Sequence, residues 1–358
     1  MADIYFRTDG NTEIATGHIM RCLAIARACA RKGADVKFIV SDEQSLDLIK
    51  ERFIVPQEFD VHCLNSNYTA LPDELPALSA LIMQDKIALD APRPWIFIDS
   101  YYATTSYLLS LRNHFRVAYL DDLRNFDCPV DLIINYDTDK DSVHYTNAGR
   151  KLLGVQYTPL RRQFACTAYT VRPAVEHVLL STGGTDPYAV AEHLLHAIYR
   201  ESPDIDPAQG TQLLQSLHYH ILTGSANIRY DALTAYARKH PNVHIHENIL
   251  DVASLMSSCD LAVSAGGTTL CELCAIGVPA ISYLMAENQR TAVETYAGAG
   301  LIPYAGDIRS ANTPVISSIL SFMTYMSQNL SARAKKSQSM RAFLNGTGAD
   351  QIACELTS

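Results

Sequence analysis

A histidine at the start of a helix is the residue of this sequence best placed to transfer a proton. His18 follows Gly17 just beyond the first expected strand, residues 4–7, where side chains of an α/β protein face the ligand crevice. The positive end of a helix disfavours an imidazolium, so we expect a neutral ring that takes a proton from water or a hydroxyl. Arg21 lies on the same helix face, and Asp9 in the preceding loop is a candidate to orient the ring. A histidine that only bonds to backbone at the helix start is the equally weighted alternative.

Two glycine turns have the composition of phosphate-binding loops. An expected strand at 177–182 and another at 261–264 each lead into such a turn and then into a helix, the turns being Gly183-Gly184-Thr185 and Gly266-Gly267-Thr268. Asp186 or Thr185 suits the N-cap of the first helix, with Pro187 at its first position. Because glycine lets backbone N–H groups approach an anion and a helix start favours negative charge, we expect the pair to hold a diphosphate. Each turn alone is equally well an ordinary strand-to-helix connection.

Glu272, in the helix after the second turn, has two competing interpretations. Thr269 and Glu272 have the spacing of a capping box, in which the glutamate only satisfies backbone donors. Alternatively, the carboxylate accepts hydrogen bonds from the two hydroxyls of a nucleotide ribose. The sequence has neither GxGxxG after its first strand nor GxxxxGK[ST], which argues against NAD binding and against a kinase-like phosphate site.

The elements that must position these residues alternate as strand, loop and helix, which predicts α/β domains with parallel sheets. A helix is expected at 18–32, and strands are expected at 4–7, 36–40, 95–99, 117–120, 132–135, 177–180, 218–222, 243–246, 261–264 and 280–284. Each apolar run ends in a polar residue, where a parallel sheet opens into its ligand crevice. We therefore predict two doubly wound Rossmann-like domains, 1–165 and 166–358, that face a central cleft, with a linker inside 154–173.

Composition and charge exclude several classes of protein. The 358 residues are 48% apolar and 19% charged, and the net charge is −9, so we expect a globular protein without a nucleic-acid or anionic-membrane surface. No apolar run reaches the roughly 18 residues that cross a bilayer. The N-terminus lacks a basic region before an apolar stretch, and the nine cysteines are scattered, as expected for reduced thiols in a cytoplasm. Cys271-x-x-Cys274 lacks the partners of a zinc site.

A series of short motifs runs along the chain. It begins with Arg7-Thr-Asp-Gly10 and Ile14-Ala-Thr-Gly-His-Ile-Met-Arg-Cys22. The later motifs are Ile98–Tyr101, Leu120–Asp122, Gly154–Phe164, Gly183–Asp186, Ser264–Glu272, Glu287–Gln289 and Asn345–Ala349. Together, and in this order, they resemble the UDP-sugar hydrolase family of pseudaminic acid biosynthesis, which is related to the spore-coat polysaccharide protein SpsG.

The resemblance implies a GT-B fold and hydrolysis of UDP-2,4-diacetamido-2,4,6-trideoxy-β-L-altrose by water attack at the anomeric carbon, with inversion. His18 is then the base that activates water, and Tyr101 and Asn288 act at the sugar. The N-terminal domain carries the sugar side and the C-terminal domain binds UDP. Substrate contacts are implied for Arg7, Asp9, Gly17, Arg21, Asp122 and Gln289, and UDP contacts for Gly183, Gly184, Thr185, Gly266, Gly267, Thr268 and Glu272.

This chemistry requires a base but no general acid, because a nucleoside diphosphate is already a good leaving group. No metal ion or other cofactor is expected, although Asp121-Asp122 resembles a metal-binding carboxylate pair. The chain departs from the family's GxGH pattern at Ala15 or Thr16, beside the expected sugar. A GT-B glycosyltransferase that passes a sugar from UDP to a glycan or polysaccharide is therefore the main alternative, and a non-catalytic sugar-nucleotide sensor is the third. The expected partner is the UDP-sugar; the sequence predicts no stable membrane insertion and gives no oligomeric state.

Overall fold

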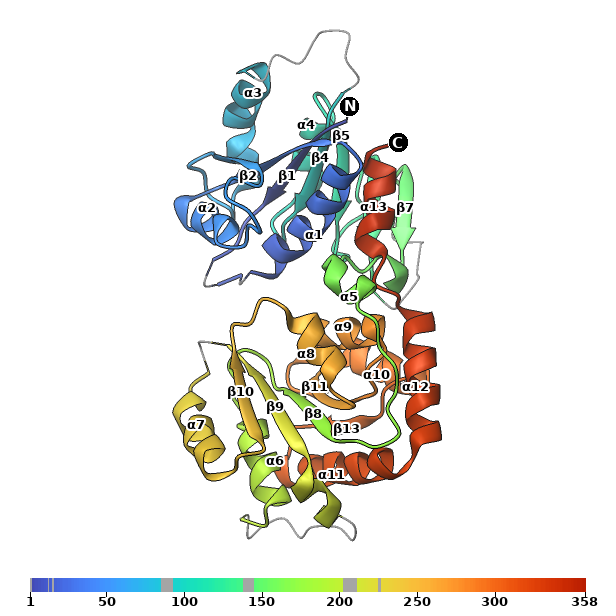
Figure 1. Ribbon diagram of the computed structural model, residues 1–358. Helices are drawn as coiled ribbons and strands as arrows, with labels where there is room; N and C mark the ends of the chain where they lie inside the picture. Colours follow the sequence, from blue (N-terminus) through green and yellow to red (C-terminus); the bar gives the residue numbers. More distant parts are fainter. Residues whose placement is uncertain are drawn as a thin grey trace. The chain divides into compact units, whose positions relative to one another are not determined.

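The computed structural model describes residues 2–11, 13–14, 16–84, 93–137, 145–201, 211–224 and 227–358. The chain forms two compact units (Figure 1), of which the first comprises residues 1–162 and 347–358 and the second residues 163–346. The predicted boundary after residue 165 lies close to this division. The C-terminus differs from the prediction, because residues 347–358 return to the first unit instead of completing the second.

The first unit is built on a seven-stranded parallel sheet with the strand order β3-β2-β1-β4-β5-β6-β7. Its strands are β1 (Asp3–Thr8), β2 (Asp35–Val40), β3 (Asp60–Cys63), β4 (Trp95–Asp99), β5 (Arg116–Leu120), β6 (Leu132–Asn135) and β7 (Arg150–Leu153). Its helices are α1 (Gly17–Arg31), α2 (Glu43–Lys50), α3 (Leu75–Gln84), α4 (Thr105–Leu111) and α13 (Gly348–Leu356), with 3₁₀ turns η1 (Leu71–Glu74) and η3 (Val155–Tyr157).

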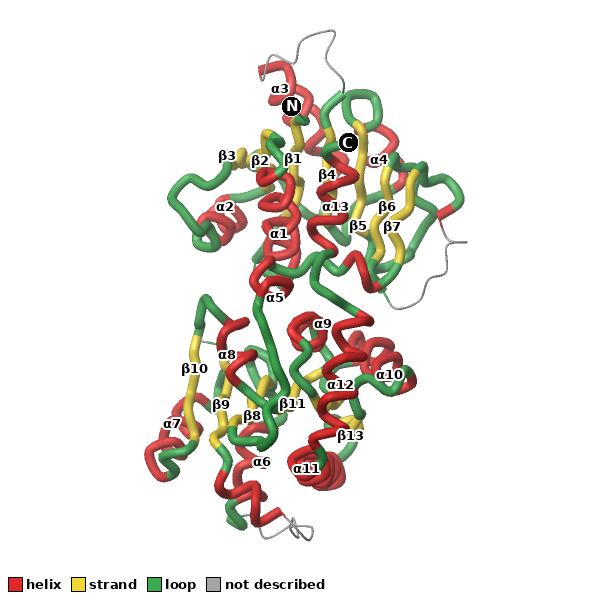
Figure 2. Tube along the Cα trace, turned by 45° about the vertical axis from the view of Figure 1, so that its right-hand side comes forward, coloured by secondary structure: helices red, strands yellow, loops and turns green. Residues whose placement is uncertain are grey.

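Helices cover both faces of this sheet, which is why its central strands are apolar almost without interruption. On one face, the rings of Phe6, Phe38 and Phe97 pack beneath α1. Ile352 and Leu356 of α13 join the same core, and Figure 2 shows α13 beside α1. The apolar face of α13 is thus the physical reason that the end of the chain belongs to the first unit.

The second unit is built on a six-stranded parallel sheet with the strand order β10-β9-β8-β11-β12-β13. Its strands are β8 (His177–Ser181), β9 (His218–Thr223), β10 (Val243–Glu247), β11 (Leu261–Ala265), β12 (Ala280–Leu284) and β13 (Tyr304–Asp307). Its helices are α6 (Val190–Ile198), α7 (Tyr230–Lys239), α8 (Val252–Ser258), α9 (Thr268–Ile276), α10 (Arg290–Gly298), α11 (Asn312–Gln328) and α12 (Leu330–Phe343), with 3₁₀ turns η4 (Thr211–Ser216) and η5 (Glu287–Gln289). Helix α5 (Arg162–Cys166) spans the division between the units.

The two sheets follow the same winding order. In each, the chain starts in the middle, moves strand by strand to one edge, and then crosses to the other side of its first strand. The order reverses between β1 and β4 in the first unit and between β8 and β11 in the second. This confirms the predicted pair of doubly wound Rossmann-like domains. It also places the His18 loop and both glycine turns at carboxyl ends of strands beside a reversal point, where α/β proteins bind ligands.

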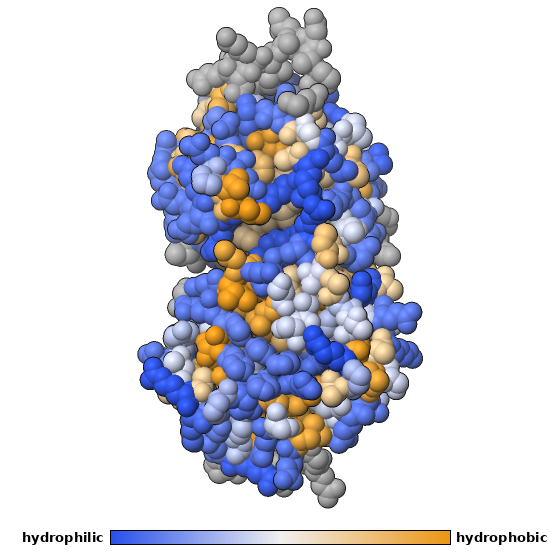
Figure 3. Space-filling model, in the orientation of Figure 1, coloured by the Kyte–Doolittle hydropathy of each residue, from blue (hydrophilic) through white to orange (hydrophobic). Residues whose placement is uncertain are grey.

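The face of the molecule drawn in Figure 3 is mostly hydrophilic, with apolar side chains in small separate areas. Among the helices described here, none combines the length and the apolar character that a bilayer span requires.

Candidate active site

His18 lies at the beginning of α1, where the chain leaves β1 and turns back onto the sheet. The helix begins at Gly17 and has no side-chain cap. The Nδ1 atom of His18 lies 2.6 Å from Oδ1 of Asp99, the last residue of β4, and both side chains are almost completely buried. Because a carboxylate only accepts hydrogen bonds, Nδ1 carries a proton, and in the neutral ring Nε2 is then the nitrogen with the lone pair. This is the tautomer that a general base needs.

Arg21 fixes the carboxylate that orients His18. Its Nε and Nη2 atoms donate to the two oxygens of Asp99 at 2.6 and 2.5 Å. Its Nη1 atom donates to Asp122 and to the Tyr136 hydroxyl, each at 2.6 Å. Burial alone would raise the pKa of Asp99, but Arg21 and His18 hold that pKa well below its ordinary value. The carboxylate therefore stays ionised, and Arg21 acts on His18 through Asp99.

Asp9, the candidate that the sequence offers to orient His18, instead turns to the other neighbour of β1. The strand lies between β2 and β4. Asp9 Oδ1 accepts hydrogen bonds from the backbone N–H and the hydroxyl of Ser41, which follows β2, at 2.7 and 2.8 Å. Asp99, at the end of β4, takes the position beside the imidazole instead.

Arg7 was expected to contact substrate, but the structure places it in the interior. Its side chain has no exposed surface. Nε and Nη2 donate to Glu74 at 2.9 and 2.8 Å, and Nη1 pairs with Asp9. Glu74 also accepts the Tyr107 hydroxyl at 2.6 Å. Every guanidinium nitrogen bonds to a buried carboxylate. Arg7 therefore holds Asp9 in place, and we assign it no contact with substrate.

A narrow space lies above His18 among aromatic side chains. Tyr101 stands edge-on to the imidazole, with 4.5 Å between ring centroids, and is 45% exposed. Tyr68 and Tyr102 form an edge-to-face pair at 5.6 Å. The space is lined by Asp9, Ile14, His18, Tyr68, Asp99, Ser100, Tyr101 and Tyr102. Aromatic rings beside a base suit a sugar, which presents apolar C–H faces as well as hydroxyls.

Sequence reasoning found some of these residues and missed others. The structure brings His18, Arg21, Tyr101 and Asp122 together, as the motifs implied. It adds Asp99, which had a signal in the sequence: it is the polar residue that ends an apolar strand and lies within one of the quoted motifs. Tyr68 lies in a loop of mixed composition, and nothing in the sequence distinguishes it.

In the second unit, the first glycine turn leads into a helix whose start is already occupied. Helix α6 begins at Val190, later than predicted, so Pro187 is not its first residue. The Asp186 carboxylate accepts the backbone N–H of Val190 at 2.9 Å and that of Ala191 at 3.1 Å. Asp186 is 1% exposed. A carboxylate of the chain therefore occupies the start of this helix. Phosphate binding by the turn Gly183-Gly184-Thr185 itself stays a prediction.

The second glycine turn leaves its helix open. The N-cap of α9 is Gly267, which has no side chain to cap the helix. In the described part of the chain, the backbone N–H groups of Thr268 and Thr269 donate to no acceptor. Gly266 is required by packing, because a Cβ atom there would overlap Cγ1 of Val293 in α10. The open amides and the positive helix end form the anion-binding feature that the sequence predicted for this turn.

The capping-box interpretation of Glu272 is wrong. That motif requires Thr269 at the N-cap, but the N-cap is Gly267 and Thr269 lies inside the helix. Glu272 lies one turn into α9 and is half-buried. Glu272 has an interaction of its own within the chain, and the ribose-binding interpretation stays a prediction.

Gln289 and Asn288 lie beside this helix start. Both belong to η5, which follows β12. The Gln289 Oε1 atom accepts the backbone N–H of Met285 at 3.2 Å, and its Nε2 atom is 3.9 Å from the Cβ position at Gly267. Asn288 is exposed. The structure thus groups Gly266, Gly267, Thr268, Asn288 and Gln289 at one end of the second sheet.

Neither cysteine of the CxxC pair, Cys271 and Cys274, has a reactive thiol. All nine cysteines are free. Burial raises the pKa of Cys271 to about 11 and raises that of Cys274 well above its ordinary value, so neither forms the thiolate that redox chemistry requires. Within the described ranges, no group of three or more His, Cys, Asp or Glu residues is arranged to hold a metal ion.

Comparison with solved structures defines the fold class. The chain matches MurG of Acinetobacter baumannii with a TM-score of 0.64 and 15% identity, over 99% of both chains. It matches Arabidopsis thaliana UGT89C1, solved in complex with UDP, with a TM-score of 0.60 and 12% identity, over 100% of both chains. The fold is therefore that of the GT-B glycosyltransferases, as predicted.

Sequence comparison agrees with this fold class, and a family model matches much of the second unit. Residues 179–338 match the family model described as Glycosyltransferase family 28 C-terminal domain. The spore coat polysaccharide biosynthesis protein SpsG of Bacillus subtilis is 28% identical over 174 residues, 48% of this chain and 48% of that protein. The UDP-N-acetylglucosamine–N-acetylmuramyl-(pentapeptide) pyrophosphoryl-undecaprenol N-acetylglucosamine transferase of an Exiguobacterium species is 35% identical over 81 residues, 21% of this chain and 23% of that enzyme. The aligned regions thus span about half or less of these two relatives.

Proposed function

We propose that the protein releases UDP from a UDP-sugar by attack of water at the anomeric carbon, with His18 as the general base. The observation that carries this proposal is the buried His18–Asp99 pair, in which Nδ1 is held by a carboxylate and the histidine lines the same space as Tyr101. In the reaction, the water oxygen bonds to the anomeric carbon while its proton moves to Nε2. The bond from that carbon to the diphosphate oxygen breaks, and its electron pair leaves with UDP. Attack opposite the leaving group inverts the anomeric centre.

The open start of α9 is the feature of the second unit that supports a diphosphate leaving group. Backbone N–H groups of Thr268 and Thr269 suit the negative charge that grows on the diphosphate as the bond breaks. In this proposal, Glu272 accepts the ribose hydroxyls, and Gln289 and Asn288 lie beside the diphosphate and sugar. The match of residues 179–338 to a glycosyltransferase family model and the UDP complex of the Arabidopsis relative support the choice of a uridine nucleotide.

For the sugar, the proposal retains a 2,4-diacetamido-2,4,6-trideoxyhexose, on the resemblance of the motifs around His18, Tyr101 and Asn288. The aromatic rings of Tyr68, Tyr101 and Tyr102 beside the His18 space support a sugar with an apolar C–H face. The first glycine turn, Gly183-Gly184-Thr185, is kept only as a wall of the nucleotide site, since Asp186 occupies the helix start behind it.

A second candidate is transfer of the sugar to a hydroxyl of a glycan or polysaccharide. The family model that matches the second unit and the named transferase among the relatives favour it. The same base would then remove the proton of the acceptor hydroxyl. The two candidates differ in one respect that an experiment can measure, namely whether UDP release needs an acceptor.

The test is incubation of the full chain with UDP-2,4-diacetamido-2,4,6-trideoxy-β-L-altrose without an acceptor, followed by NMR of the anomeric proton. We expect inverted free sugar and UDP. His18→Ala should lower turnover by roughly a thousandfold, and Asp99→Asn by roughly a hundredfold or more, because the ring loses its tautomer and its orientation. His114→Ala, at an exposed histidine of the same unit, is the matched control and should keep full activity. Turnover that appears only after a glycan acceptor is added would establish the transferase instead.

A further inference from the structure

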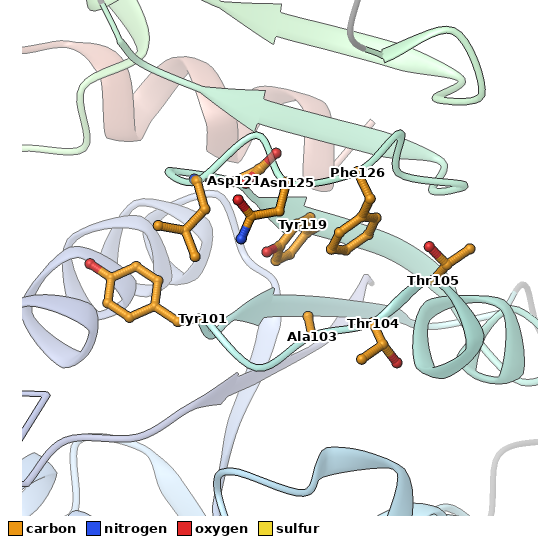
Figure 4. Close-up of a pocket in the computed structure, with 9 residues that line it drawn as sticks. Tyr101, Ala103, Thr104, Thr105, Tyr119, Asp121, Asn125 and Phe126 are labelled. Carbon is orange, nitrogen blue, oxygen red and sulfur yellow. Dashed lines mark hydrogen bonds between the residues drawn. The ribbon is translucent and has the colours of Figure 1, made fainter.

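A second, larger cavity of the first unit lies next to the His18 space and shares Tyr101 with it. It has a volume of about 270 Å³ and lies at the carboxyl ends of β4 and β5. Figure 4 shows Tyr101 at one end of the hollow and Thr104 and Thr105 at the other. The residues that line it are Tyr101, Ala103, Thr104, Thr105, Tyr119, Asp121, Leu123, Asn125 and Phe126. Neither the base nor the proposed nucleotide residues line it.

One wall of the cavity is aromatic and apolar. The rings of Tyr119 and Phe126 lie nearly parallel, with 6.3 Å between centroids and 15° between planes. Ala103 forms part of the floor and is 5% exposed. Figure 4 shows both rings turned toward the hollow between the two loops. Such a wall suits a methyl group or the C–H face of a sugar ring.

The cavity offers no positive charge to a ligand. Its one carboxylate among the described lining residues is that of Asp121, and both oxygens of Asp121 already accept hydrogen bonds within the chain. Oδ1 accepts the backbone N–H of Leu123 at 2.9 Å and that of Arg124 at 3.0 Å, and Oδ2 accepts the Tyr145 hydroxyl at 3.1 Å. Among the described lining residues there is no lysine or arginine. A phosphate or a carboxylate would lose its hydration here without finding a counter-charge, so the cavity favours a ligand without negative charge.

The other polar groups of the lining are the hydroxyls of Tyr101, Thr104, Thr105 and Tyr119 and the exposed amide of Asn125. Figure 4 shows this amide directed into the hollow, opposite Tyr101 and Ala103. Among the residues described, it has no hydrogen-bond partner, whereas Thr104 already accepts the backbone N–H of Tyr107. A side-chain amide both donates and accepts, and therefore matches another amide group for group.

We propose that this cavity is the subsite for an N-acetyl group of the sugar and that Asn125 determines specificity by bonding the acetamido N–H and C=O, with the methyl group against Phe126. This inference rests on the proposed function, because Tyr101 joins the cavity to the His18 space. The acetamido group belongs to the departing sugar if the protein is a hydrolase, or to the acceptor if it is a transferase.

The first experiment needs no turnover. Saturation-transfer NMR of the full chain with N-acetylglucosamine and with glucose should show binding of the acetylated sugar, with its methyl protons receiving the strongest transfer. Asn125→Ala and Asn125→Asp should each reduce this preference by roughly tenfold, because the acetamido group loses its hydrogen-bonding partner. Asn113→Ala is the matched control, since Asn113 is an exposed asparagine outside the cavity, and it should keep the preference. Equal binding of the two sugars to the unmodified chain, or no change in either Asn125 variant, would overturn the inference.

The second experiment separates this inference from the proposed function. Turnover of UDP-N-acetylglucosamine and UDP-glucose is compared in the unmodified chain, in Asn125→Ala and in His18→Ala. Loss of all turnover in His18→Ala with an unchanged preference in Asn125→Ala refutes the subsite and leaves the function intact. No turnover of any UDP-sugar, with the NMR preference still dependent on Asn125, refutes the function and keeps the subsite. Free N-acetylglucosamine should inhibit if the subsite holds the departing sugar and should speed UDP release if it holds the acceptor.

Discussion

The two glycine turns of the second unit are almost identical as sequence and different as structure. Each follows an apolar parallel strand and leads into a helix at the carboxyl edge of the same sheet. At α6, the Asp186 carboxylate of the chain bonds the first backbone N–H groups of the helix. At α9, the N-cap is Gly267 and the first helix amides of Thr268 and Thr269 remain open.

The comparison teaches that a glycine turn is an anion site only when nothing in the chain competes for the helix start. One acidic residue near the turn converts an anion-binding terminus into a stabilised helix cap, since both uses draw on the same N–H groups. The difference between the two turns can therefore be tested by adding a carboxylate at the start of α9 or by removing the one at the start of α6.

The largest effect is expected from Gly267→Asp, which places a carboxylate at the N-cap of α9 as a competitor for its first backbone N–H groups. The N-cap backbone of Gly267 is extended, and a Cβ atom there would meet nothing closer than Gln289 at 3.9 Å, so aspartate fits and caps the helix. We expect UDP affinity, measured by calorimetry, to fall by roughly a hundredfold through competition and like-charge repulsion. The thermal midpoint should stay equal or rise.

Gly267→Asn separates the two causes in that experiment. Asparagine also caps a helix but carries no charge, so its loss of UDP affinity should be smaller than that of aspartate. Unchanged UDP affinity in Gly267→Asp would show that the diphosphate does not bind at α9.

Gly266→Ala should cost about 2 kcal/mol of unfolding free energy, because overpacking in a filled space typically costs about 1–3 kcal/mol. The new methyl group would overlap Val293 in α10. Urea unfolding measures the loss, and the double variant Gly266→Ala with Val293→Ala should recover part of it. Additive losses in the double variant would contradict the packing explanation.

Asp186→Ala should lower the unfolding free energy by about 1–2 kcal/mol, as the loss of a helix cap does, and should leave UDP affinity within about twofold. Denaturant unfolding and calorimetry test the two halves of this prediction. A large change of UDP affinity would place the diphosphate at α6 and reverse the comparison.

The smallest effect is expected at strands β8, β9 and β10, on the face of the sheet opposite α6. Five histidines share this face, and their ring nitrogens pair at 2.9 to 3.2 Å in the contacts His177–His220, His218–His244 and His220–His246. Burial, with the neighbouring histidines, lowers the pKa of His220 to about 4. The His220 ring is thus packed in its neutral form.

Acid should weaken this face selectively. The pKa of His220 is lower in the folded than in the unfolded chain, so the unfolded chain takes up the proton first, and stability is lost as the pH falls from about 6.5 towards 4. For a half-buried ring we expect a loss of about 1 kcal/mol. Hydrogen exchange, corrected for intrinsic rates, should rise at pH 5 in residues 218–223 and 243–247 more than in 261–265 and 280–284. His220→Gln should reduce the difference; an equal rise in all four segments would contradict it.

Local pattern was enough to predict the alternation of strands and helices, the positions of most strands, and the placing of His18 and both glycine turns at strand ends. Apolar runs with polar ends specify buried parallel strands, and the carboxyl ends of such strands lie at one edge of a sheet. Chain order also predicted two units of nearly the observed extent. The return of α13 to the first unit was not predictable, because the sequence of an apolar helix face does not specify which of two cores the helix packs against.

The sequence by itself determined which histidine stands at a helix start beyond a strand, as a candidate base, and which turns have the freedom to bind an anion, since both depend on residue types within a few positions of each other. Only the tertiary structure decided that Asp99 and not Asp9 holds the imidazole, because that choice depends on which strand lies beside β1. It also decided that Asp186 closes one helix start while Gly267 leaves the other open. A carboxylate has the same chemistry at every position, but which N–H groups it reaches is set by backbone geometry that no local pattern specifies.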